Sequence, residues 1–255
     1  MSHTSKRFLE RRLRKKVGQA IYDYRMIEHG NRVLVAISGG IDSIVMMKIL
    51  AALKEAAPVE CELIPVHVST GFEKDFERVA HWIQDNLGYK VLIHDSEISQ
   101  IMDIAADPEK SACALCSRLR RGILYGLAQE MGAASIALGH HMDDIIETFF
   151  LRCFYTGQIG AMAPARYSDD GKNRIIRPLA YCPAELIKSY FLHLDIAPVT
   201  VACPIRSDSK RGLIRDYIKR IENDIPYVKY SVFASLGNID MKSLCEKDNT
   251  HADRD

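Results

Sequence analysis

The stretch Asn31–Ser43, with the sequence NRVLVAISGGIDS, decides the fold of this chain. Its residues 33–37 form a continuous apolar run that is too short to cross a membrane and is typical of a buried parallel strand. The run ends at Ser38-Gly39-Gly40-Ile41-Asp42-Ser43, and the residues that follow have the apolar pattern of a buried helix. The stretch therefore predicts a strand, a sharp glycine turn and the start of a helix.

The turn has the composition of a phosphate site. Gly39 and Gly40 let the backbone turn sharply and leave its N–H groups uncovered, and the start of a helix attracts anions. Ser38 and Ser43 add hydroxyl donors, whereas Asp42 would repel a phosphate unless a cation lies between them, which implies Mg²⁺. Ser, Asp and Gly are also ordinary cap and turn residues. The whole hexapeptide at a strand-to-helix turn nevertheless favours binding of ATP phosphates.

The rest of the chain predicts an α/β fold, with a Rossmann-like parallel sheet flanked by helices. We expect an N-terminal basic helix at 1–30, the nucleotide-binding domain at 31–222, and a partly flexible C-terminal extension at 223–255. Ligands of such sheets bind beyond the carboxyl ends of the strands. His67 and Val68 end one expected strand and Gly139 follows another, so their backbone is expected to border ATP. We expect strands at 61–68, 90–94 and 133–138, a hairpin at 165–178, and helices at 73–87, 113–131, 145–155, 183–194 and 209–222.

The bulk composition is that of an ordinary globular protein of 255 residues, with 47% hydrophobic and 26% charged residues. No signal peptide and no apolar stretch of membrane-spanning length is visible, so no membrane association is expected. Seven cysteines without a secretory signal indicate a reducing compartment, and we expect a cytoplasmic protein. The net charge of +1 means that any argument for RNA binding must rest on local patches.

One such patch is the first helix, whose apolar residues recur at helical spacing while its other face is strongly basic. Arg11, Arg12 and Lys15 belong to this face. A solvated face explains such a run as readily as contact with RNA phosphates does.

The pair Cys113 and Cys116 has three interpretations: a redox pair, half of a zinc site, or half of an iron–sulfur site. A redox pair is expected after a strand, whereas this pair follows a loop, and no second C-x-x-C completes a zinc site. Cys203 provides a third thiol, and three cysteines can hold three irons of a 4Fe-4S cluster and leave the fourth open to sulfide. Cys182, beside a proline, is the main competitor for the third position.

The segment Gly139–Glu147, GHHMDDIIE, places two carboxylates at another helix start. Capping of the helix alone would explain two aspartates at this position, without any further function. The preceding strand, however, should end at the same sheet edge as the phosphate turn. Asp143 is therefore expected to complete a Mg²⁺ site with Asp42, and both are expected to be catalytic.

The turn SGGIDS resembles that of the PP-loop ATP pyrophosphatases, which implies transfer of AMP to a substrate oxygen with release of pyrophosphate. The segments CALCSRLRRGIL, ALGHHMDDIIETFF, DDGK and IRPLAYC, taken together, resemble the tRNA 2-thiocytidine biosynthesis proteins over nearly all of residues 33–222. That resemblance implies sulfuration of a cytidine in tRNA with ATP, Mg²⁺ and a 4Fe-4S cluster. It also implies a sulfur donor such as a cysteine desulfurase or free sulfide, and we expect a homodimer as one possible assembly. Arg118, Arg120 and Arg121 are expected to face RNA phosphates or the leaving AMP.

Two positions depart from that family's pattern. Ile41 stands where the family usually has lysine, and Arg206 stands where it usually has the second cysteine of a pair that begins at Cys203. Two alternatives therefore stay open: an adenylating enzyme for another nucleobase or a small molecule, and a non-catalytic protein that binds ATP and RNA.

Overall fold

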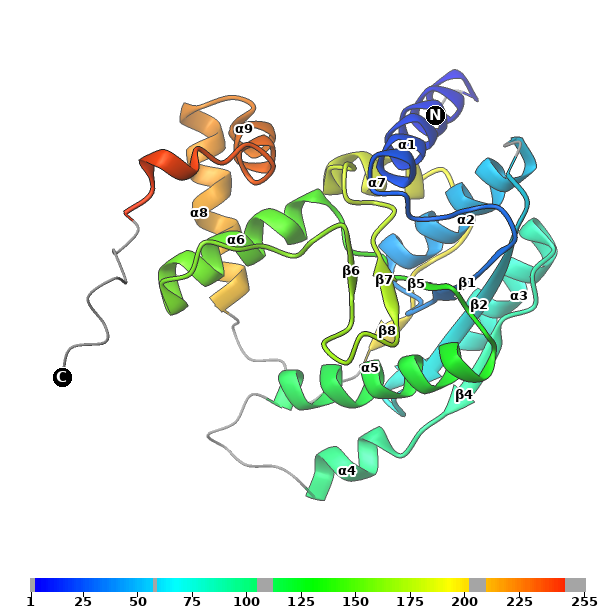
Figure 1. The fold of residues 1–255 in the computed structure, drawn as a ribbon. Helices are drawn as coiled ribbons and strands as arrows, with labels where there is room; N and C mark the ends of the chain where they lie inside the picture. Colours follow the sequence, from blue (N-terminus) through cyan, green and yellow to red (C-terminus); the bar gives the residue numbers. More distant parts are fainter. Residues whose placement is uncertain (1–2, 57–58, 105–111, 202–209, 246–255) are drawn as a thin grey trace.

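The computed structural model describes residues 3–56, 59–104, 112–201 and 210–245. A six-stranded sheet in the order β4-β2-β1-β5-β7-β6 forms the centre of the molecule (Figure 1). The first five strands in this order are parallel, and β6 runs antiparallel to β7 at the edge. The strands are β1 (Asn31–Ala36), β2 (Cys61–Ser69), β4 (Leu92–Asp95), β5 (Ser135–Ala137), β6 (Ala165–Tyr167) and β7 (Arg174–Ile176). The predicted Rossmann-like α/β fold is confirmed.

Helices cover both faces of the sheet, because the central strands are apolar on both sides. Val33 and Val35 of β1 pack against one helical layer, and Leu34 packs against the other. The first layer consists of α1 (His3–Asp23), α2 (Ile41–Ala56), α3 (Phe76–Leu87) and α7 (Ala184–Phe191). The second layer consists of α4 (Ile98–Ile104) and α5 (Ala112–Glu130). The phosphate turn thus lies between β1 and α2, at the carboxyl edge of a sheet buried on both faces.

A separate group of helices stands beside the sheet. It consists of α6 (Met142–Thr156), α8 (Lys210–Asp224) and α9 (Val228–Ser235), followed by the short 3₁₀ helix η1 (Met241–Ser243). Met142, Ile146, Ile214 and Ile218 form its buried core. Glu147 is only 2% exposed and binds two arginines of α8: Arg215 Nε lies 2.7 Å from Oε1, and Arg211 Nη1 lies 3.3 Å from Oε2. These ion pairs fix α8 against α6.

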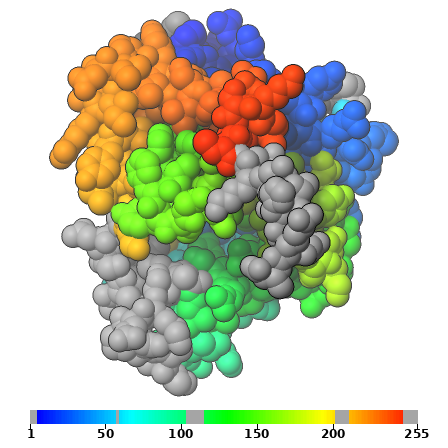
Figure 2. Space-filling view, turned by 60° about the vertical axis from the view of Figure 1, so that its left-hand side comes forward, coloured from blue at the N-terminus to red at the C-terminus, as the bar shows by residue number. Residues whose placement is uncertain are grey.

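The N-terminal helix belongs to the main core. Leu13 and Val17 of α1 are fully buried in the same cluster as β1 and α2. Tyr190 of α7 donates a hydrogen bond to Glu10 (3.0 Å). The space-filling view shows α1 next to the C-terminal helices (Figure 2), and Lys16 Nζ lies 5.6 Å from the ring centre of Tyr230 in α9. The basic helix expected at 1–30 is therefore packed on the domain that follows it.

Two local features differ from the sequence prediction. The expected helix at 73–87 begins only at Phe76, because Glu73–Lys74 forms a short strand, β3, paired with β8 (Thr200–Val201). The helix α9 (VKYSVFAS) was not predicted, because it is only eight residues long and its apolar residues have no clear helical periodicity. The predicted hairpin is present, with Gly171 in its turn at a φ of 72°.

Candidate active site

Ser43 organises the phosphate turn from its centre. Its hydroxyl accepts hydrogen bonds from the backbone N–H of Ser38 (3.2 Å) and from the Ser38 hydroxyl (3.1 Å). It also donates to the carbonyl oxygen of Gly40 (2.9 Å), while Gly40 N–H donates to Ser38 Oγ (3.3 Å). Ser43 is 3% exposed, so the turn closes on its own side chains and leaves the following N–H groups at the start of α2.

Two glycines allow other parts of the chain to support this turn. Gly39 has a φ of +79°, and a Cβ atom there would lie 2.5 Å from Val199 Cγ2. Its carbonyl oxygen accepts a hydrogen bond from Val199 N–H (2.9 Å). Gly139 follows β5, and a Cβ atom there would lie 3.2 Å from Ser43 N. The turn therefore needs glycine at 39 for its backbone, and a residue without a side chain at 139 for close packing.

The turn opens into a cavity of about 560 Å³ between the sheet edge and α5, here called the arginine cavity. Four arginines line it, against two carboxylates. The polar and glycine residues of its wall are Ser38, Asp42, Ser43, Ser117, Arg120, Arg121, Tyr125, Gly139, His140, Asp144, Arg166 and Arg177. The excess of guanidinium groups makes this cavity suited to phosphate groups.

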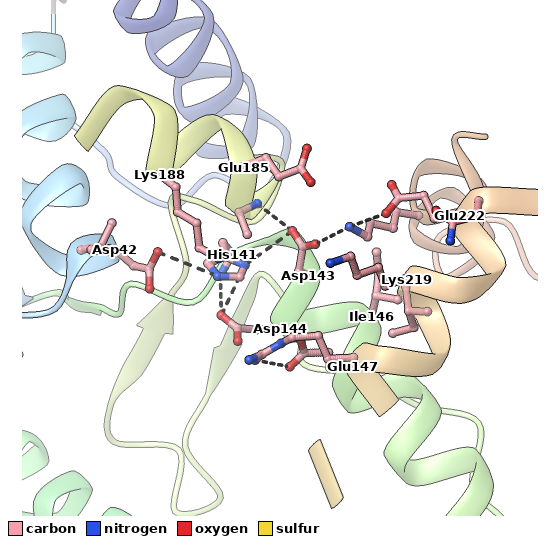
Figure 3. A pocket seen from close by; sticks show the side chains of 16 residues that line it. Asp42, His141, Asp143, Asp144, Ile146, Glu147, Glu185, Lys188, Lys219 and Glu222 are labelled. Carbon is pink, nitrogen blue, oxygen red and sulfur yellow. Dashed lines mark hydrogen bonds and ion pairs between the residues drawn. The ribbon is translucent and has the colours of Figure 1, made fainter. Parts of the chain in front are cut away.

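A second cavity of about 630 Å³ lies on the other side of Asp42, between α2, α6, α7 and α8; it is here called the ionic cavity (Figure 3). Asp42 and Asp144 line both cavities, whereas Asp143 lines only the ionic cavity. Asp143 Oδ2 accepts a hydrogen bond from Ala184 N–H (2.7 Å), and its Oδ1 lies 3.2 Å from Lys229 Nζ. Asp42 and Asp143 thus share one cavity, and the adjacent Asp144 also faces the phosphate turn.

His141 connects the three carboxylates. Its Nε2 atom lies 3.8 Å from Asp42 Oδ1, and its Nδ1 atom lies 3.5 Å from Asp144 Oδ2. Burial raises the pKa of Asp42, and the neighbouring Asp144 adds to this rise. His141 and Lys188 act in the opposite direction and lower the pKa of Asp42. Within the described residues no group of three or more His, Cys, Asp or Glu side chains is arranged as a metal site. Mg²⁺ usually binds through one or two carboxylates and completes its coordination with phosphate oxygens and water, so a preformed protein cage is not needed for it.

Two nitrogen atoms in the wall of the arginine cavity are buried without a hydrogen-bond partner among the described residues, although Arg177 also donates from Nη1 to the carbonyl oxygen of Ala163. Arg177 is 8% exposed, and its Nε atom has no hydrogen bond among the described residues. His140 Nδ1 is likewise unpaired there, and burial together with the nearby Arg177 lowers the pKa of His140 to about 4. Burial also lowers the pKa of Arg177 to about 10, which leaves it charged at neutral pH. Buried groups without partners are costly, so this wall fits a polar ligand.

The other expected ATP contacts are placed as follows. His67 is 1% exposed; its ring stacks on Phe76 at 3.4 Å, and its Nδ1 atom lies 2.8 Å from the Ile37 carbonyl oxygen. Val68 is also buried, at 2% exposed. Neither residue lines the arginine cavity, so the structure gives His67 a packing contact and leaves its backbone as the part available to a ligand.

The expected RNA contacts fall into two groups. Arg120 and Arg121 line the arginine cavity, whereas Arg118 is exposed and does not. Arg11, Arg12 and Lys15 are exposed on α1, the outer helix of the first layer, and Arg12 lies 5.6 Å from the ring centre of Phe8.

The expected cluster ligands are described only in part. Cys116 is half-buried near the start of α5, and Cys113 is located one turn earlier in the same helix. Residues three apart share a helix face, and a helix start stabilises thiolates, so these two positions fit a thiolate-bound cluster. Cys203 lies outside the described residues. Cys182, the competitor, is fully buried in the core, where burial raises the pKa of its thiol to about 12.

Sequence reasoning missed several residues of these cavities, of which Arg177 is the most informative. It follows β7, which pairs in parallel with β5, so it lies at the ligand-binding edge of the sheet. The hairpin predicted at 165–178 includes Arg177, but the parallel pairing of its second strand with β5 was not predicted. His140 and Asp144 adjoin the predicted site residues Gly139 and Asp143: His140 lies in the turn after the buried strand β5, and Asp144 lies in the first turn of α6.

A serine–glycine turn between a central parallel strand and its helix, opening into an arginine-lined cavity, defines a PP-loop nucleotide-binding protein. The sequence profile of the PP-loop domain matches residues 9–220. The fold agrees: the U34-tRNA thiolase NcsA from Methanococcus maripaludis, solved with its [4Fe-4S] cluster, superposes with a TM-score of 0.74 at 21% identity, over 91% of this chain and 79% of that one. NMN synthetase from Francisella tularensis superposes with a TM-score of 0.51 at 14% identity, over 98% of this chain and 99% of that one.

Sequence relatives narrow this class. A tRNA-cytidine(32) 2-sulfurtransferase from Shewanella denitrificans is 42% identical over 90% of this chain and 72% of its own length. Another with that name, from Pseudomonas fluorescens, is 37% identical over 94% of this chain and 88% of its own length. The chain therefore belongs to the PP-loop family and, within it, to the family of the tRNA-cytidine(32) 2-sulfurtransferases. None of the helices in the described ranges is long and apolar enough to span a membrane.

Proposed function

We propose that this chain uses ATP to replace the C2 oxygen of a cytidine in tRNA by sulfur, releasing AMP and pyrophosphate. The observation that carries the proposal is the phosphate turn 38–43, which opens into a cavity lined by four arginines. Its sequence relatives, named tRNA-cytidine(32) 2-sulfurtransferases, support the choice of tRNA and of cytidine.

The chemistry requires activation, because the C2 oxygen of cytosine is a poor leaving group. Attack of this oxygen on the α-phosphorus of ATP forms one P–O bond and breaks another, so that pyrophosphate leaves. Addition of sulfur at C2 then expels AMP, which takes the former C2 oxygen with it. The N–H groups of the turn hold the phosphates, and Arg120, Arg121 and Arg177 stabilise the negative charge that develops on them.

The proposed Mg²⁺ ligands are Asp42 and Asp143. Asp42 lies beside the turn and is available to the arginine cavity. Asp143 already binds Ala184 N–H and Lys229, so Lys229 must be displaced before Asp143 can bind a cation directly. Asp144, which faces both cavities, adds a carboxylate on the phosphate side.

The proposed cluster ligands are Cys113, Cys116 and Cys203, because a soft thiolate set suits iron and sulfide. When bound, a 4Fe-4S cluster supplies the sulfur that reaches C2. We propose a cysteine desulfurase or free sulfide as the source of that sulfur, a cytoplasmic location, and a homodimer as the assembly. The proposed RNA contacts are Arg11, Arg12 and Lys15 on α1, with Arg118 at the start of α5.

The test of this function is pyrophosphate release from ATP by anaerobically prepared protein, with and without tRNA, followed by mass spectrometry of the digested nucleosides. We expect release that depends on tRNA and the appearance of 2-thiocytidine. Release driven by a small molecule, or thiolation of another base, would contradict the cytidine assignment. ATP binding without any release would indicate a non-catalytic protein.

The cluster is tested separately by its metal content. Serine variants of Cys113, Cys116 and Cys203 are each expected to lose iron and sulfide after anaerobic reconstitution. Cys182→Ser is the matched control and should retain both, because Cys182 is buried in the core. Full iron content in Cys203→Ser, together with loss of iron in Cys182→Ser, would show that Cys182 and not Cys203 is the third ligand. Zinc in place of iron would remove the sulfur-transfer mechanism.

A further inference from the structure

The phosphate turn carries no positive side chain of its own. Its single charged residue is Asp42, which is negative. A polyphosphate bound there therefore meets a carboxylate, and cations from other elements must offset the repulsion. The arginine cavity supplies such cations on one side of Asp42. The ionic cavity, on the other side, is lined by Lys188, Arg215, Lys219 and Lys229.

Two of these four cations are already paired. Arg215 Nε lies 2.7 Å from Glu147 Oε1. Lys229 Nζ lies 2.8 Å from Glu222 and 3.2 Å from Asp143. Lys188 and Lys219 have no ion pair within 4.0 Å among the described residues. Lys188 and Lys219 are therefore the cations of this cavity that can accept a new anion without breaking a contact.

Lys188 is the one directed toward the phosphate turn. It projects from α7, and Figure 3 shows its side chain reaching toward His141, beside Asp42, whereas Lys219 comes from α8 at the opposite side. Lys188 and Asp42 line the same cavity. Ile41, the residue of the turn next to Asp42, lines the same cavity.

The helix that carries Lys188 is held firmly at the correct position. Ile187 is fully buried and Tyr190 donates a hydrogen bond to Glu10 of α1 (3.0 Å), while Ala184 N–H binds Asp143. Lys188 itself is exposed, so its flexible stem can extend from a fixed base. An ammonium group on such a stem binds phosphate as a point charge and needs no fixed geometry.

We infer that Lys188 is a phosphate-binding residue, which reaches from α7 to the β- and γ-phosphates of ATP on the turn and to the pyrophosphate that leaves. This inference rests on the proposed function, since it assumes that the turn binds ATP. Lys188 would supply the turn with a positive charge from outside the motif, on the side of Asp42 that the four arginines of the arginine cavity do not line.

The test is isothermal titration calorimetry with ATP, pyrophosphate and AMP in the presence of Mg²⁺, which needs no catalytic activity. Lys188→Met is expected to weaken ATP and pyrophosphate binding about 10-fold, the effect of losing one charged hydrogen bond, and to leave AMP binding unchanged. Lys219→Met is the matched control, because it removes the same charge from the far wall of the same cavity, and should bind like the wild type. Adding Ile41→Lys to Lys188→Met should restore affinity, since residue 41 lines that cavity.

The inference is wrong if Lys188→Met binds ATP and pyrophosphate as tightly as the wild type does. It is also wrong if Lys219→Met weakens ATP and pyrophosphate binding equally, because the effect would then come from the net charge of the cavity and not from contact with Lys188. A fall in AMP binding as large as the fall in ATP binding would contradict it as well. A wild-type protein that binds neither ATP nor pyrophosphate would overturn this inference and the proposed function together. Because Lys188 is exposed, thermal unfolding should confirm that each variant is folded.

Discussion

Replacement of Gly39 by alanine tests whether the phosphate turn is supported by Val199. Gly39 has a φ of +79°, and an alanine Cβ there would lie 2.5 Å from Val199 Cγ2 and 2.8 Å from Val199 Cβ. Gly30 provides a matched control, because its φ is +77° and a Cβ atom there would meet nothing within 4 Å. The two substitutions impose the same backbone strain, and only Gly39→Ala adds a steric overlap.

The expected magnitudes follow from these two terms. The left-handed conformation costs alanine about 1–2 kcal/mol, which is the whole effect expected for Gly30→Ala. Overpacking against Val199 adds about 1–3 kcal/mol, so Gly39→Ala should lose about 2–5 kcal/mol of unfolding free energy. Relief of the overlap must move either Val199 or the turn, and movement of the turn disturbs the N–H groups that bind phosphate. Gly39→Ala should therefore also weaken ATP binding, and Gly30→Ala should not.

The assay is urea unfolding of both variants, with ATP affinity measured on the folded proteins. A difference of about 1–3 kcal/mol between them, with loss of affinity in Gly39→Ala alone, is the expected result. Equal destabilisation of the two variants with unchanged ATP binding would show that Val199 moves away freely and does not support the turn.

Three further predictions concern charge. Asp42→Asn should abolish pyrophosphate release while the protein stays folded by circular dichroism, because the carboxylate beside the phosphate turn serves to hold Mg²⁺; wild-type release would refute this. Reversal of Arg11, Arg12 and Lys15 to glutamate should weaken tRNA binding, and a plot of log affinity against log salt should become less steep by about 0.7–0.9 per lost phosphate contact; an unchanged slope would identify a solvated face. The pKa of His140 falls from 6.5 to about 4 on folding, so the unfolded state takes up a proton first as the pH decreases. Unfolding free energy should accordingly be retained above pH 6.5 and fall toward pH 4, and this loss should be smaller in His140→Gln when urea midpoints are compared at pH 7 and 5; an identical loss in that variant would contradict the assignment.

The sequence was sufficient for the parts of the fold that local patterns specify. The apolar run of β1 and the glycine turn after it predicted a parallel strand and a phosphate site, because few other arrangements satisfy both. The hairpin around Gly171 was predicted for the same reason, since its residues determine its turn. The first residues of the expected helix at 73–87 were wrong, because Glu73–Lys74 is held as a strand by β8, about 125 residues later in the chain.

The candidate site was harder to predict, because its walls come from distant segments. That Asp42 and Asp143 line one cavity followed from the rule that parallel strands end at one sheet edge. The salt bridge of Asp143 with Lys229 could not be predicted from that rule, because it depends on how α9 packs against α6, and α9 has no clear periodicity. Arg177 was missed because its position depends on the pairing of β7 with β5, which hairpin patterning alone does not specify.

The supports of the phosphate turn have a consequence for the order in which the protein is made. The motif itself is complete at Ser43, but Gly139 packs against it and Val199 binds it much later in the sequence. Chains emerge from the ribosome N-terminus first. A nascent or truncated chain that ends before residue 199 therefore contains the whole motif but lacks one of the contacts that fix the conformation of the turn. We expect such fragments to bind ATP poorly, so the nucleotide cannot serve as an early template for folding and can stabilise only the nearly finished protein.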